Sequence, residues 1–81
     1  MVLLSDGRTV LEVYKVTGRV SPEDVEKVLV GQAGKVFLTK TKRNNVLVSV
    51  RGSEGTVNSI GELLKSNFGK DVSLPNPTEE H

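Results

Sequence analysis

The side chains best suited to chemistry in this sequence are the cations of one stretch, residues 35–51. Five of the chain's 11 basic residues lie there and none of its 10 acidic residues, although the whole chain has a net charge of only +1. Charge of one sign gathered in one place creates a local potential that net charge does not report. We therefore expect this stretch to meet an anionic partner. Its cations are Lys35, Lys40, Lys42, Arg43 and Arg51.

The centre of this stretch has the composition of a phosphate-binding element. Phosphates are held by Lys and Arg, and amide side chains add hydrogen bonds. A two-stranded ribbon also fits the major groove of a duplex. The alternative interpretation is a solvated turn, because lysines on an edge strand also prevent aggregation. The predicted nucleic-acid-binding residues, for either DNA or RNA, are Lys40, Lys42, Arg43, Asn44, Asn45 and Arg51.

The residue types needed for catalysis are scarce. The chain has no Cys, and its single His is His81. Glu23 and Asp24 are adjacent, so on a helix they diverge by roughly 100° and cannot face each other as an acid–base pair. The glycine-rich residues 52–56 lack the Gly-Lys-Ser/Thr of a P-loop. We expect a protein that binds rather than catalyses, with no metal, cofactor or small-molecule substrate.

Composition limits the organisation and the compartment. Eighty-one residues correspond to one domain, which we place at residues 1–74, with residues 75–81 as a flexible tail because Pro75 and Pro77 disfavour regular structure. The longest apolar run is residues 1–4, far short of the ~20 residues of a membrane span. The absence of Cys fits a reducing compartment. We therefore expect a cytoplasmic protein.

Two predicted hairpins and two predicted helices position these residues. Asp6-Gly7 is a strong turn signal within a hairpin over residues 2–17. A helix is expected to begin at Ser21 as N-cap, with Pro22 in the first position. A second begins at Ser53 and carries an apolar stripe. Gly61 lies within that helix, where glycine costs about 1 kcal/mol relative to Ala, and this indicates close packing. The stripe is Val57, Ile60, Leu64 and Phe68.

The order ββαββα(β) predicts an α+β fold, an antiparallel sheet with two helices on one face. We consider a ferredoxin-like arrangement and a tandem ββα pseudo-repeat. These two arrangements conflict at one edge of the sheet. If the first strand pairs with the free edge of the second strand, the last strand must pair with another edge. Single-strand RNA-binding sheets share this order but stack bases on aromatics of two central strands. Here one candidate central strand, residues 46–50, is aliphatic.

Turn length sets which side chains of the second hairpin face the core. A two-residue turn at Asn44-Asn45 would place Phe37 and Thr39 with Val46, Val48 and Val50 on the helix side. A three-residue turn would instead place Lys40 there, which is unfavourable for a charge. We therefore predict the two-residue turn.

Apolar residues on both faces of the sheet suggest a second function, because an uncovered apolar face usually has a partner. The alternative to nucleic-acid binding is thus an interaction or assembly module that self-associates, most simply as a dimer. Its predicted interface residues are Tyr14, Leu38 and Leu47.

Overall fold

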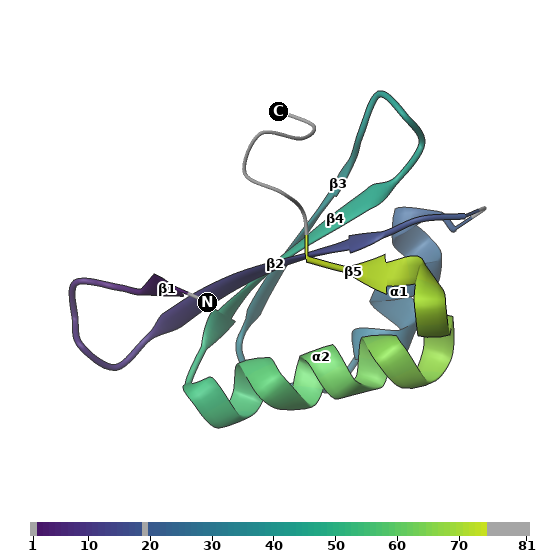
Figure 1. Ribbon diagram of the computed structural model, residues 1–81. Helices are drawn as coiled ribbons and strands as arrows, with labels where there is room; N and C mark the ends of the chain where they lie inside the picture. The colour runs from purple at the N-terminus through teal and green to yellow at the C-terminus, as the bar shows by residue number, and fades with distance from the viewer. Residues whose placement is uncertain (1, 19, 75–81) are drawn as a thin grey trace.

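The computed structural model describes residues 2–18 and 20–74. Within them the chain forms one antiparallel sheet of five strands and two α-helices (Figure 1), so the predicted α+β class is confirmed. The predicted tail, 75–81, lies outside the described residues. In chain order the elements are β1 (Val2–Leu3), β2 (Val10–Val16), α1 (Pro22–Leu29), β3 (Lys35–Lys40), β4 (Val46–Gly52), α2 (Glu54–Phe68), the 3₁₀ turn η1 (Gly69–Asp71) and β5 (Val72–Ser73).

The two central strands are β2 and β4, and β3 lies on the outer side of β4. The other edge of β2 is shared by two short strands. β1 pairs with Val10 and Leu11, and β5 pairs with Lys15 and Val16. The expectation that β1 would exclude the last strand from this edge was therefore wrong. The seven residues of β2 accommodate both partners because each partner is only two residues long.

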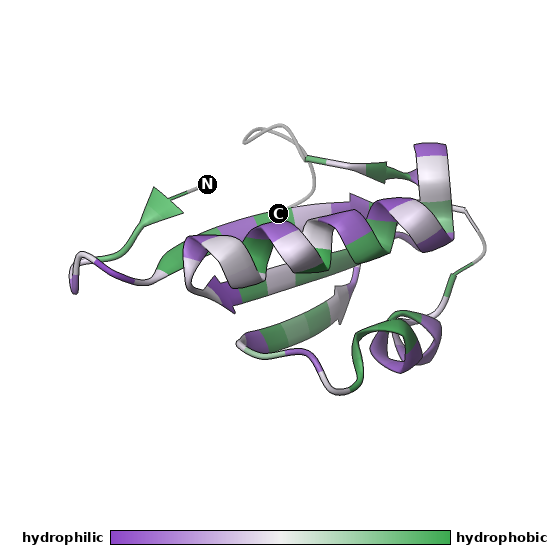
Figure 2. Ribbon diagram, turned by 90° about the horizontal axis from the view of Figure 1, so that it is seen from below, coloured by the Kyte–Doolittle hydropathy of each residue, from purple (hydrophilic) through white to green (hydrophobic). Residues whose placement is uncertain are grey.

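Both helices contribute to a core on one face of the sheet. Figures 1 and 2 show α2 lying along the strands, with α1 beside it. Side chains alternate between the two faces of a strand, so every second residue of β2 and β4 meets the helices. We call this side the helix-covered face. The buried core is Val10, Tyr14, Val16, Val25, Leu29, Val46, Val48, Val50, Val57, Ile60 and Leu64.

The helix starts follow the predicted capping chemistry. The Ser21 hydroxyl accepts a hydrogen bond from the Asp24 backbone N–H at 3.2 Å, and the Asp24 carboxylate accepts one from the Ser21 N–H at 3.1 Å. The bond from the Ser21 N–H, with a smaller contribution from the Ser21 side chain, holds the pKa of Asp24 below its ordinary value. Ser53 caps α2 through the Thr56 N–H at 3.2 Å. Both predicted N-caps are therefore confirmed. No described helix is long and apolar enough to cross a bilayer.

The hairpin predicted around Asp6-Gly7 is confirmed. Val2 pairs with Leu11 and Leu3 with Val10. The turn is held by the Asp6 carboxylate, which accepts hydrogen bonds from the Thr9 side chain and from two backbone N–H groups. These bonds lower the pKa of Asp6, and the bond from the Thr9 side chain has the largest effect.

The predicted register of the second hairpin was wrong. Leu38 pairs with Val48 and Lys40 with Val46, so both face the helix-covered side. The turn has three residues between Thr41 and Asn45, which are joined by a 2.8 Å backbone hydrogen bond. Asn44, the third of these residues, has φ +62°, the left-handed conformation that a three-residue hairpin loop requires at this position. The expected penalty for Lys40 is avoided because it sits at the end of β3 and remains exposed.

Candidate nucleic-acid interface

The turn between β3 and β4 projects beyond the helices (Figure 1). Lys42 and Arg43 in this turn and Lys40 at the end of β3 are all exposed, as is Asn44, whereas Asn45 is half-buried. Four of the six predicted binding residues therefore extend into solvent at one end of the hairpin. We refer to Lys40, Lys42 and Arg43 as the tip cations.

One threonine holds the backbone of this turn. The Thr41 hydroxyl accepts hydrogen bonds from the N–H groups of Arg43 at 3.2 Å and Asn45 at 3.1 Å. The Thr41 carbonyl accepts a third from the Asn44 N–H, also at 3.1 Å. The tip cations are consequently carried on a turn whose path is set by local bonds, while their own long side chains extend outward.

The structure separates Arg51 from the tip. Arg51 lies five residues beyond Val46 on β4, which is roughly 17 Å along an antiparallel strand. There it pairs directly with Lys35 of β3 and with Leu11 of β2. The basic stretch of the sequence therefore forms two clusters, the tip cations and the cross-strand pair Lys35–Arg51.

The sheet face opposite the helices, which we call the open face, has a regular composition. Hydrogen-bond register places its side chains in three rows across β2, β4 and β3. None of these side chains is acidic, because Glu12 alternates onto the helix-covered face with Tyr14. The rows are Leu11, Arg51 and Lys35; then Val13, Ser49 and Phe37; then Lys15, Leu47 and Thr39.

Phe37 is the functional candidate that sequence reasoning missed. It occupies the middle row of the open face opposite Ser49, and 58% of its surface is exposed. The predicted two-residue turn would have placed Phe37 on the helix-covered face. The signal that would have corrected this lies in Thr41 and Asn44, which suit the start and the left-handed position of a three-residue loop.

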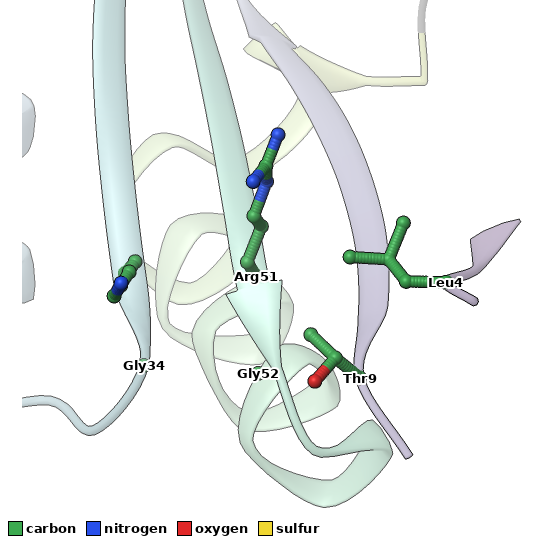
Figure 3. A pocket seen from close by; sticks show the side chains of 6 residues that line it. Leu4, Thr9, Gly34, Arg51 and Gly52 are labelled. Carbon is green, nitrogen blue, oxygen red and sulfur yellow. The ribbon is translucent and has the colours of Figure 1, made fainter. Parts of the chain in front are cut away.

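A shallow hollow of about 420 Å³ adjoins the pair Lys35–Arg51. In Figure 3 the Arg51 side chain extends over the sheet and Leu4 points towards it from the first hairpin. Gly34 allows the two strands to approach here, because a Cβ at this position would lie 2.7 Å from the Arg51 carbonyl oxygen. The lining residues are Leu4, Thr9, Gly34, Lys35, Arg51 and Gly52.

The three predicted interface residues do not form one surface. Leu47 lies on the open face, but Tyr14 and Leu38 face the helices. The Tyr14 hydroxyl lies 3.5 Å from the Val57 carbonyl oxygen, to which it donates. Burial, with smaller contributions from Glu12 and Glu62, raises the pKa of Tyr14.

Among residues 2–18 and 20–74, no three His, Cys, Asp or Glu side chains gather where they could hold a metal ion. Comparison with models of protein families, with curated proteins and with solved structures found no match to this chain. The function must therefore be argued from the surfaces described above.

Proposed function

We propose that this protein is a small, non-catalytic nucleic-acid-binding protein whose β3–β4 hairpin contacts phosphates. The observation that carries this proposal is the exposure of the tip cations on a turn that projects beyond the helices. Cations on a protruding element reach phosphate oxygens without competing acidic side chains, and residues 35–51 contain none.

The hydrogen-bonded backbone of the turn supports the same proposal. Hydrogen bonds to the Thr41 hydroxyl define the backbone before any ligand arrives, so less conformational freedom is lost on binding. Asn44, exposed at the tip, offers an amide that can donate to phosphate oxygens. Lys35 and Arg51 supply a second point of contact further along the hairpin.

We also propose that the fold is of the ferredoxin-like type, with β1 as an addition. In the unit β2–α1–β3, strand β4 lies between the two strands in the sheet, and in β4–α2–β5 strand β2 does. Two such split βαβ units are the defining feature of that arrangement. The alternative ββα repeat has less support because α1 has 8 residues and α2 has 15.

Neutralising the tip cations should weaken nucleic-acid binding at least about tenfold at low salt, because three phosphate contacts are lost. The variant is Lys40→Gln/Lys42→Gln/Arg43→Gln. Fluorescence anisotropy with labelled single- and double-stranded oligonucleotides, DNA and RNA, would measure it at several salt concentrations. The salt slope should also fall by about 2–3, since each contact contributes roughly 0.7–0.9.

The matched control removes the same charge from the helical side, where Lys27, Lys65 and Lys70 are exposed. Lys27→Gln/Lys65→Gln/Lys70→Gln should bind nearly as well as the original protein. Equal weakening by both triple variants would mean that overall charge, rather than the hairpin, attracts nucleic acid. No binding by the original protein at low salt would exclude the proposed function.

The second candidate is an assembly module that forms a dimer through the open face. Its supporting observation is apolar surface there, since Phe37 and Val2 are each 58% exposed, and Leu47 is half-buried. Such a dimer would bring like charges together, because β2, β3 and β4 place no acidic side chain on that face among the described residues. We therefore expect any such dimer to strengthen with salt and to dissociate in Leu47→Asp. Sedimentation equilibrium measures both, and a monomer at all protein and salt concentrations would rule the dimer out.

A further inference from the structure

We propose that the open face binds a single strand of nucleic acid, with Phe37 stacking on a base and the pair Lys35–Arg51 holding the backbone phosphate. This inference rests on the proposed function and adds to it a second contact surface and a class of ligand. The tip cations would then contact phosphates further along the same strand.

The charge of the open face favours an anionic occupant. Lys35 and Arg51 lie directly opposite each other on neighbouring strands, a placement of like charges that destabilises a sheet. Within the described residues neither side chain makes a hydrogen bond or an ion pair. A phosphate between them would convert this repulsion into two charge-assisted contacts.

The position of Phe37 favours an anion that also carries aromatic bases. Its ring is 58% exposed in the row next to the charged pair, so a phosphate and its base can be bound together. Stacking on an aromatic ring tolerates every base, because each base has a π-face. In a duplex those faces are covered by neighbouring base pairs, and only an unstacked strand presents them.

The same features disfavour a second copy of the chain as the occupant. Two-fold pairing of this face would place Lys35, Arg51 and Phe37 against a partner surface of the same composition. In the part of the chain that the structure describes, β2, β3 and β4 offer no acidic side chain on this face to compensate the cations. A single-stranded nucleic acid would both compensate the cations and cover Phe37, because it supplies negative charge and flat apolar surface together.

The decisive variant is Phe37→Leu, which keeps an apolar side chain but removes the aromatic face. Anisotropy titrations would compare a single-stranded oligonucleotide, a strand of the same length and charge with abasic sites throughout, and a duplex. We expect Phe37→Leu to weaken binding of the normal strand about tenfold and to leave the abasic strand unaffected. Lys35→Gln/Arg51→Gln should weaken both strands, because both retain phosphates. Val30→Ala, an exposed apolar position at the end of α1, is the control and should change neither.

A second variant at position 37 tests the same contact if Phe37→Leu fails to fold. The chain contains no Trp, so Phe37→Trp introduces a single tryptophan, on the open face, whose emission can be separated from that of Tyr14 by the choice of excitation wavelength. Its fluorescence should be quenched by the normal strand and not by the abasic strand, whereas Val30→Trp should respond to neither.

The outcomes separate this inference from the proposed function. If Phe37→Leu changes both strands equally, or if the duplex binds as tightly as the single strand, the open face is not the site and the inference fails. The proposed function survives that result provided that the tip variant still weakens binding. If the original protein binds no oligonucleotide at low salt, both fail together. A dimer lost in Leu47→Asp without any oligonucleotide binding would identify a second copy as the occupant.

Discussion

Gly34→Ala should destabilise the protein by about 2–5 kcal/mol, combining a backbone cost of about 1–2 with an overpacking cost of about 1–3. Gly34 has φ +90°, and its added Cβ would lie 2.7 Å from the Arg51 carbonyl oxygen. That oxygen belongs to a central strand and cannot move aside as a flexible side chain would. Urea unfolding followed by far-UV circular dichroism would measure the loss.

The control is Gly31→Ala, which isolates the backbone cost. Gly31 has nearly the same dihedral, φ +86°, but a Cβ there would meet nothing within 4 Å. We expect Gly31→Ala to cost only the conformational part, about 1–2 kcal/mol. Equal losses in the two variants would contradict the close approach of β3 and β4 at this point. The expected loss at Gly34 is a large share of the total, since a chain of this length has a free energy of unfolding of about 4–12 kcal/mol.

Gly61→Ala should destabilise the protein by up to about 2 kcal/mol, because an overpacking cost of about 1–3 kcal/mol is offset only in part by the gain of about 1 kcal/mol that alanine brings to a helix relative to glycine. A Cβ on Gly61 would lie 2.5 Å from the Tyr14 hydroxyl and 3.0 Å from the ring carbon that bears it. The Tyr14 ring is buried between β2 and α2 and is only 8% exposed. The expected close packing of Gly61 is thereby confirmed, and the cost should appear in the same urea titration.

Two further variants test the cause of this loss. Gly55→Ala lies in the same helix with open space around it, so it should stabilise the protein by up to about 1 kcal/mol. In a Tyr14→Phe background the nearest clashing atom is gone, and Gly61→Ala should cost less than in the original protein. An unchanged cost in that background would show that the two positions are not coupled.

Local features of this fold were predictable because they depend on residues a few positions apart. Ser21 and Asp24 form their capping box within a single turn of helix. Asp6 and Gly7 define the turn of the first hairpin. The apolar stripe of α2 is buried at Val57, Ile60 and Leu64, as a 3.6-residue period requires.

The sharing of one β2 edge by β1 and β5 was not predictable in the same way. It depends on where the chain returns after α2, and on the fact that two residues of β5 occupy only the end of β2 near Lys15 and Val16. Short-range patterns contain no information about which part of an edge remains free. Only the assembled sheet decides it.

For the candidate site, the order of residues alone indicates that the cations gather on one hairpin and that Asn44 lies in its turn. The tertiary structure decided that Lys35 and Arg51 form a separate pair and that Phe37 is exposed beside them. The physical reason is the two-residue alternation of a strand. One additional residue in a turn moves every side chain of β3 to the other face, and the packing of Val36 and Leu38 against the core favours the observed register.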